Sequence, residues 1–397
     1  MGTFFALLRR GLGVAAICLL GGSLWAPLLP TVALAEDSAA AAGQPTSGKA
    51  APAPPQRPVD PPPSSPHWTF SAEAIALGRS VGVNQALVGQ LPGATTTFAQ
   101  TYDQAGVEAL NANQFWQRLA AGPKVGLTYR GDSGYGFELS YFSVLDLSAA
   151  KSVGPDGDWL LMTAPGTFWQ TQDFPDQAMA WKDTTSLYSA EANGRLDLSP
   201  RVTMLAGLRW LRLNDRLVGW LTPADQYQPT WKKYCSDDTL DQVDQVCPGA
   251  PILAAGDNPP FWTASVTNNL YGAQVGVEAT LLELGRLSLD GVAKVGVFDN
   301  AAEQTTAVSM QKQLFTAHAT SNAVAFSGEA QLRASYRLGD GLALQVGYEA
   351  LWLGGVALAP GQIRETETTP SSVSALGVNH GSSALFQGAT LGLAYSF

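Results

Sequence analysis

Few residues in this 397-residue sequence could carry out acid–base, nucleophilic or metal chemistry. The three histidines are His67, His318 and His380, and no metal-ligand spacing or nucleophile motif surrounds them. Asp299 could in principle meet His318, as a catalytic carboxylate would need to. No motif supports that pairing, so the sequence predicts no enzyme activity, no cofactor and no metal site.

Cys235 and Cys247 are a second chemical feature. If the chain is exported, an oxidising compartment would let them form a disulfide that closes a loop. Four aspartates lie between them, and these could bind Ca²⁺. The glycine and glutamate that an EF-type loop requires at its sixth and twelfth positions are missing. We therefore expect a solvated acidic loop, which contains Asp237, Asp238, Asp241 and Asp244.

Charged residues are the third feature, because they recur at alternate positions of apolar segments. Only 14% of the residues are charged, and the net charge is −10, which argues against binding to nucleic acid. A strand sends alternate side chains to opposite faces, so one face would be apolar and the other charged. The charged face is expected to line an interior through Glu73, Lys124, Glu138, Glu191, Arg195, Arg209, Glu278, Asp290, Lys294, Glu329, Arg333 and Glu349.

Ten segments with a period of two residues must position these charges. Tyr135-Gly-Phe-Glu-Leu-Ser-Tyr141 shows the pattern, with apolar residues alternating with Glu138 and Ser140. Outward-facing aromatic residues near the strand ends, such as Trp210 and Tyr271, would form girdles. The strands are expected over 68–80, 116–130, 134–147, 184–198, 201–216, 268–282, 286–299, 322–338, 341–356 and 384–397.

The connections between these segments alternate strictly between short and long. Gly339-Asp-Gly341 is a tight hairpin signal, and three other connections are equally short. The long connections cover about 81–115, 148–183, 217–267, 300–321 and 357–383. Short periplasmic turns and long extracellular loops characterise transmembrane barrels. The sequence therefore predicts an all-β, antiparallel, up-and-down transmembrane β-barrel of about ten strands.

The region before residue 68 has a different composition. Arg9 and Arg10, an apolar run and Ala33-Leu-Ala35 are typical of a cleaved signal peptide over 1–35, and a single membrane anchor is the alternative. Residues 36–66 are rich in proline and alanine and predict an extended linker, either a periplasmic tether or a passive spacer. The barrel would then occupy 67–397.

The last eight residues, Thr390-Leu-Gly-Leu-Ala-Tyr-Ser-Phe397, place four apolar residues on one face of a strand. Thr390, Gly392, Tyr395 and Phe397 match the C-terminal signal of bacterial outer-membrane barrels, and the chain resembles that superfamily over 68–397. It is more loosely similar to beta-barrel porin families of planctomycetes and proteobacteria, through segments such as Gly122-Pro-Lys-Val-Gly-Leu-Thr-Tyr-Arg130. The resemblance implies the outer membrane as location, its lipids as partners, and assembly machinery that binds the C-terminal strand.

Two functions are open. The barrel could be a small porin-type channel for polar solutes or ions, with selectivity set by its mixed-charge interior. Alternatively, it could be a surface or structural protein whose barrel anchors aromatic loops that bind a partner. Ten strands leave little room between long side chains, so the charges could equally pair and fill the interior. The loop residues Trp159, Trp169, Trp181, Trp231 and Trp262 could form a ligand surface or pack internally.

Overall fold

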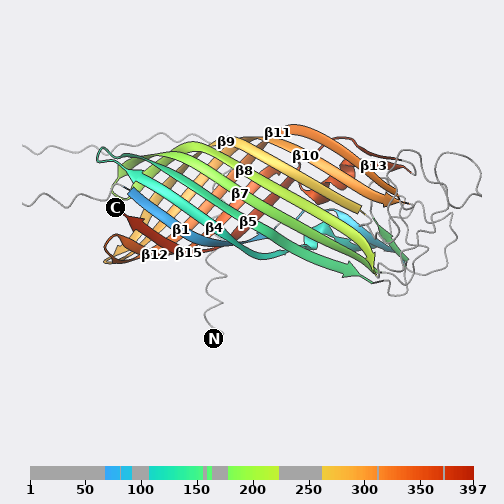
Figure 1. Cartoon of the computed structure of the whole chain (residues 1–397), viewed down its shortest axis with the longest axis horizontal. Coiled ribbons are helices and arrows are strands. Elements are labelled where there is room, and N and C mark those ends of the chain that lie inside the picture. Colours follow the sequence, from blue (N-terminus) through green and yellow to red (C-terminus); the bar gives the residue numbers. More distant parts are fainter. Residues whose placement is uncertain are drawn as a thin grey trace, which may run out of the picture. The chain divides into compact units, whose positions relative to one another are not determined.

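The computed structural model describes residues 68–80, 82–91, 107–154, 159–162, 178–222, 262–310, 313–369 and 372–397. The expected signal peptide, the linker over 36–66 and the Cys235–Cys247 pair lie outside these residues. Ten antiparallel strands close into a barrel in the order β1-β15-β12-β11-β10-β9-β8-β7-β5-β4 (Figure 1). Their bounds are β1 Trp68–Ser80, β4 Gln117–Arg130, β5 Tyr135–Val153, β7 Ala178–Ser199, β8 Val202–Thr222, β9 Trp262–Leu284, β10 Leu287–Met310, β11 Gln313–Gly339, β12 Leu342–Val356 and β15 Ser382–Ser396.

Smaller elements occupy the long connections. One sheet contains β2 (Ala86–Leu91), β3 (Val107–Asn111) and β6 (Trp159–Met162), and another contains β13 (Thr366–Thr369) and β14 (Ser372–Ala375). Two 3₁₀ helices, η1 (Ala112–Gln114) and η3 (Ala359–Glu365), complete the described structure. No helix in this part of the chain is long and apolar enough to cross a membrane.

The predicted fold class and all ten predicted strands are confirmed. One predicted loop is wrong: most of 300–321 is strand, because β10 and β11 stay paired from Leu287↔Tyr336 to Met310↔Gln313. Strands β7, β8 and β9 also extend past their predicted loop-side ends. We call this side of the barrel the loop end, and the side of the four tight connections the turn end.

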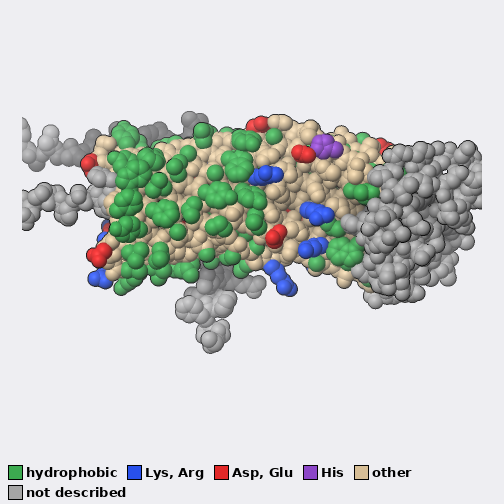
Figure 2. Space-filling model, in the orientation of Figure 1, with side chains coloured by type: hydrophobic (Ala, Val, Ile, Leu, Met, Phe, Trp, Pro, Cys, Tyr) green, Lys and Arg blue, Asp and Glu red, His purple; other side chains and the backbone are tan. Residues whose placement is uncertain are grey.

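Exposed apolar residues of the strands form an apolar belt on the half of the barrel nearest the turn end, and Figure 2 shows this belt on the face in view. Aromatic residues border the belt, with Trp68, Tyr129 and Phe137 in mutual ring contact at the turn end. On β8 the belt runs from Val202 to Trp210, which is roughly 20 Å at the usual strand tilt and close to the ~25 Å of outer-membrane barrels. Its exposed members include Leu139, Met204, Leu208, Tyr271, Val275, Val277, Val295, Val297, Phe326, Leu332, Leu344, Val346, Leu391 and Leu393.

The polarity of the wall reverses beyond Trp210. On β8 the outward positions become Arg212, Asn214 and Arg216, while the inward neighbours Leu211 and Leu213 are fully buried. Inside a membrane the outer face must be apolar, whereas in water it must be polar. The reversal therefore marks where the barrel leaves the membrane, and the strands continue as a barrel extension with a conventional apolar inside.

Candidate functional site

The inward positions of β8 pass through four layers of the barrel interior in order. Arg209 belongs to an ion-pair network, and Leu211 and Leu213 to an apolar layer. Asp215 follows in a second ionic cluster, and Leu217 lies in an upper apolar core. A cavity of about 650 Å³ lies on the turn-end side of the network. The same sequence of layers recurs on the neighbouring strands.

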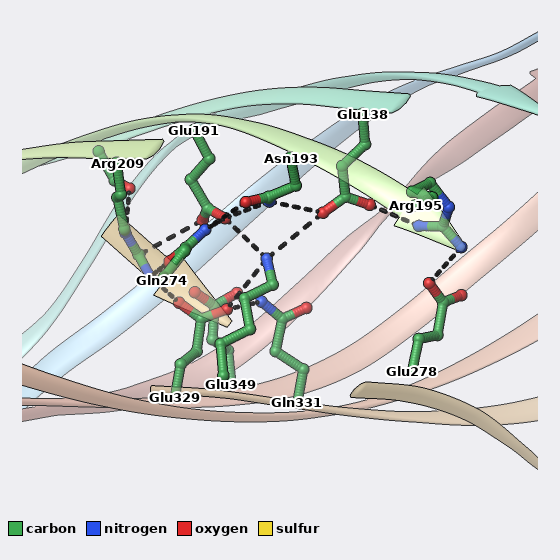
Figure 3. A network of polar contacts seen from close by, with 12 residues as sticks. Glu138, Glu191, Asn193, Arg195, Arg209, Gln274, Glu278, Glu329, Gln331 and Glu349 are labelled. Carbon is green, nitrogen blue, oxygen red and sulfur yellow. Dashed lines mark hydrogen bonds and ion pairs between the residues drawn. The ribbon is translucent and has the colours of Figure 1, made fainter. Parts of the chain in front are cut away.

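Arg209 and Lys294 each pair with carboxylates of two or more strands, and Figure 3 shows the labelled Arg209 close to Glu191 and Glu329. Arg209 Nη1 lies 2.6 Å from Glu329 Oε2, and its Nη2 lies 3.5 Å from Glu191 Oε1. Lys294 Nζ lies 2.7 Å from Glu191 Oε2 and 3.7 Å from Glu138 Oε1. These side chains come from β5, β7, β8, β10 and β11, so the network ties opposite walls of the barrel together.

Three further ion pairs extend the network towards the cavity. Arg195 contacts Glu138 Oε2 at 2.5 Å and Glu278 Oε2 at 2.6 Å. Lys124 Nζ contacts Glu349 Oε2 at 2.5 Å. Buried charges are tolerated when each has a hydrogen-bonded partner of opposite sign, and this network meets that condition. Its pairing fills much of the cross-section.

The apolar layer beyond the network is built from the barrel wall. Nine of the ten strands contribute a buried member, and β4 adds the partly buried Ala120. The Phe298 ring lies against Gly272 and Gly296, where a Cβ would approach it within 2.6 and 2.7 Å. The wall members are Ile75, Leu77, Phe142, Val144, Leu147, Leu187, Leu211, Leu213, Leu270, Phe298, Ala325, Leu351, Leu353, Val356, Ala384 and Phe386.

The second ionic cluster lies at the level of Asp215 in the barrel extension. The Arg79 guanidinium contacts Asp183 Oδ2 at 2.6 Å and forms a second ion pair with Asp215. Thr185 Oγ1 donates to Asp215 Oδ1 at 2.7 Å, and Gln117 Nε2 donates to Thr185 Oγ1 at 2.8 Å. One cation thus faces two carboxylates in an interior that excludes water.

The connection after β12 folds into the barrel as a plug, which we define as residues 357–365. The Ala357 N–H donates to Asn268 Oδ1 at 2.8 Å, and Asn268 Nδ2 donates to the Ala357 carbonyl at 2.7 Å. The Ala359 N–H donates to Asp215 Oδ2 at 2.8 Å. Ala357 and Ala359 are fully buried, so inward polar groups of the wall fix the plug's backbone.

The segment that follows the plug also returns to the barrel wall. Gln304 Nε2 donates to the Gly377 carbonyl, and Asn300 Nδ2 lies 3.4 Å from His380 Nδ1. Partial burial lowers the pKa of the His380 imidazole below its ordinary value, which favours the neutral ring. This connection closes the loop end of the described barrel.

Trp181 and Trp262 lie on strands β7 and β9, whereas the sequence had placed both in loops. Both rings are buried, and their centroids lie 5.5 Å apart in the upper apolar core. This burial supports internal packing for these two residues. Trp169 and Trp231 lie outside the described residues, as does the side chain of Trp159.

The structure places most of the residues predicted to line the interior in the network. The exceptions, Glu73, Asp290 and Arg333, line the cavity. The structure does not bring Asp299 and His318 together: Asp299 Oδ2 accepts from Asn322 Nδ2 at 3.1 Å, while His318 Nδ1 lies 3.6 Å from Glu303.

The sequence interpretation missed the second ionic cluster and the plug. Asp183 had been assigned to a loop, and Arg79 and Asp215 were not singled out. Asp183 lies an even number of residues from Glu191 along β7, so both side chains fall on the same inward face. The alternation therefore could have predicted that Asp183 faces inward. For the plug no comparable signal exists, because its contacts are made by backbone groups.

The closed barrel, its apolar belt and its aromatic borders define a transmembrane β-barrel. No family model matches the chain, which leaves the looser likeness to porin families without support, and no curated protein matches it either. Among solved structures it is similar to the outer membrane protease OmpT of Escherichia coli, with 12% identity, a TM-score of 0.41, and coverage of 84% of this chain and 97% of that one. It is also similar to the toluene transporter TbuX of Ralstonia pickettii, with 9% identity, a TM-score of 0.30 and coverage of 84% and 90%. The translocator domain of the autotransporter NalP of Neisseria meningitidis matches with 9% identity, a TM-score of 0.32 and coverage of 84% and 90%.

Proposed function

We propose that this protein is an outer-membrane barrel with a closed interior, which anchors the barrel extension outside the cell. It keeps the anchoring barrel of the second function that the sequence left open, with the barrel extension in place of the aromatic loops as the anchored part. One observation carries the proposal: the apolar layer, to which nine strands contribute buried side chains, separates the cavity from the loop end. An ion crossing this layer would lose its hydration without gaining a partner.

The closure lies in the wall and does not depend on the plug alone. Leu211, Leu270 and Leu351 project from strands whose backbones are hydrogen-bonded to both neighbours around the ring. Removing the plug would therefore leave the apolar layer in place. Widening the layer would require the barrel itself to open, which breaks a ladder of backbone hydrogen bonds.

The conducting state of the inserted protein tests this proposal. We expect the refolded chain to give no conductance steps in a planar bilayer. Gel electrophoresis checks that the barrel is folded, because a folded barrel migrates faster before boiling than after it. Reproducible steps from the inserted protein would contradict the closed interior. The expectation that the chain is not an enzyme stays a prediction.

A porin-type channel is the second candidate, favoured by the cavity that enters the barrel from the turn end. If such a channel conducts, Glu138→Ala and Arg333→Ala should change its cation-to-anion preference, since both residues line that cavity. If neither substitution changes the cation-to-anion preference of the conducting channel, the mixed-charge interior is not its selectivity filter.

The barrel extension is the part that would meet a partner. Beyond the belt its outer face is polar, and β2, β3 and β6 form a separate sheet at the same end. In this proposal the turn end faces the periplasm. Thr390, Gly392, Tyr395 and Phe397 then lie at the periplasmic end of β15, or directly after it, where assembly machinery would bind. Tyr395 and Phe397 are exposed and their rings stack at 5.8 Å.

Contacts with outer-leaflet lipid provide a prediction for the proposed location. Arg212 is the next outward position beyond Trp210, beside Tyr188 and Asn269 in register, and Arg216 lies two outward positions further along the same strand. Figure 2 shows Lys and Arg side chains on this face beyond the hydrophobic belt. We expect Arg212→Ala/Arg216→Ala to bind a diphosphorylated lipid A roughly 30-fold more weakly, at about 1 kcal/mol per cation.

The matched control removes two exposed cations, Arg201 and Arg286, from the turn end. Titration of each refolded variant with lipid A in detergent gives the comparison. An equal loss in the control, or no loss in the test variant, would show that phosphate does not bind at this face.

A further inference from the structure

The cavity at the turn end contains a carboxylate that has no partner in the described structure. Glu73 lines the cavity and is only 8% exposed, yet no described residue forms an ion pair or hydrogen bond with it. Its register neighbour Lys124 pairs with Glu349 instead. A buried carboxylate without a partner is costly, so this group is suited to a ligand that brings a positive charge.

A cation on the same wall is also weakly engaged. Arg333 lines the cavity, where its hydrogen bond to a described residue runs 3.4 Å from Nη2 to Gln331 Oε1, and it interacts electrostatically with Glu278. Asp290 lies opposite Arg333 in register, but it accepts hydrogen bonds from Thr280 at 2.8 Å and Ser288 at 3.4 Å. The guanidinium therefore has donors available for an anion.

Strand order explains why Glu73 and Arg333 do not neutralise each other. Glu73 on β1 lies beside Gly392 on β15, which lies beside Gln345 on β12. Arg333 on β11 lies beside Gly347, two residues from Gln345. Three strand spacings and an offset of two residues separate the two charged residues, which is about 16 Å between Cα atoms along the wall.

Two glycines make room for neighbouring side chains in the wall between them, and the wall offers an acceptor. The Glu73 side chain occupies the space over Gly392, where a Cβ would lie 2.5 Å from Glu73 Cγ, and Thr390 Oγ1 occupies the space over Gly347, 2.6 Å from such a Cβ. The Gln345 Oε1 atom is buried and has no hydrogen-bond partner. Along this wall a carboxylate, an unpaired amide oxygen and a guanidinium follow one another.

We propose that this wall binds a small zwitterion, namely a short peptide with a free ammonium and a free carboxylate. The ammonium group donates to Glu73 and to Gln345 Oε1, and the carboxylate accepts paired hydrogen bonds from Arg333. Both side chains extend into the cavity, so the gap between the Glu73 carboxylate and the Arg333 guanidinium is shorter than the Cα separation. This gap suits the distance between the two termini of a short peptide. The binding site itself follows from the cavity; only the periplasmic source of the ligand rests on the proposed orientation.

Calorimetric titration of the purified full-length protein in detergent with glycylglycine tests the proposal. We expect saturable binding that weakens about tenfold when the peptide is N-acetylated, and about tenfold when its carboxylate is amidated. Glu73→Gln should remove the preference for the free ammonium alone. Arg333→Gln should remove the preference for the free carboxylate alone.

The control variants are Glu283→Gln and Arg337→Gln. These residues form an exposed ion pair of 2.7 Å at the same end of the barrel, outside the cavity lining. Both should bind glycylglycine as the wild type does. Absence of wild-type binding, equal binding of the capped peptides, or unchanged affinity in Glu73→Gln and Arg333→Gln would each overturn the proposal. None of these outcomes bears on the closed interior, which conductance tests separately.

Discussion

Replacing Arg79 with alanine is expected to lower the free energy of unfolding by about 3–5 kcal/mol, because it leaves a buried carboxylate pair without its cation. Asp183 and Asp215 both contact the Arg79 guanidinium, and all three side chains are at most 2% exposed. Water cannot reach the carboxylates in the folded barrel, so solvent cannot replace the lost partner. Chemical denaturation of the refolded barrel in vesicles measures the effect.

Lys182→Ala is the matched control for this prediction. Lys182 precedes Asp183 on β7 but faces outward and is exposed, so its loss should change stability by no more than ~0.5 kcal/mol. Removing the charges together, in Arg79→Met with Asp183→Asn and Asp215→Asn, should restore most of the stability. If Arg79→Ala were no more destabilising than Lys182→Ala, the buried cluster would not be fully desolvated.

Asn268→Leu is expected to release the plug. The substitution keeps the number and branching of side-chain heavy atoms but removes both hydrogen bonds to Ala357, leaving that residue's N–H and carbonyl without partners. It also removes the hydrogen bonds of Asn268 with the Leu213 carbonyl and with Asn300. At about 1–3 kcal/mol for each unsatisfied buried group, the plugged state should lose about 2–6 kcal/mol. Hydrogen exchange of the Ala357 amide should accelerate accordingly.

The neighbouring residue provides the control. Asn269 faces the outer surface of the extension, where Asn269→Leu removes no contact to the plug. We expect its exchange pattern over residues 357–365 to match that of the wild type. Slow exchange of Ala357 in Asn268→Leu would mean that the plug is held by packing. Because the apolar layer comes from the wall, Asn268→Leu should still give no conductance.

The alternation of residue types predicted the barrel well wherever the membrane imposes it. Val202 to Trp210 must be apolar outside and polar inside, and the period of two follows directly from strand geometry. Beyond Trp210 the same alternation continues with its polarity reversed, as in Leu211 and Arg212. The strand predicted over 201–216 continues past this reversal, but 300–321 was predicted to be a loop although β10 and β11 stay paired through most of it.

The sequence by itself therefore determined the all-β class, the ten strands, their antiparallel order and which charges face inward, since each depends on local periodicity and on short connections. Only the tertiary structure decided which charges pair, because Arg209 and Glu329 are 120 residues apart and meet only after the ring closes. Closure likewise decided that the inward leucines form a continuous layer and that Ala357 and Ala359 enter the barrel. Those contacts depend on the stagger of the strands around the ring, which no single strand encodes.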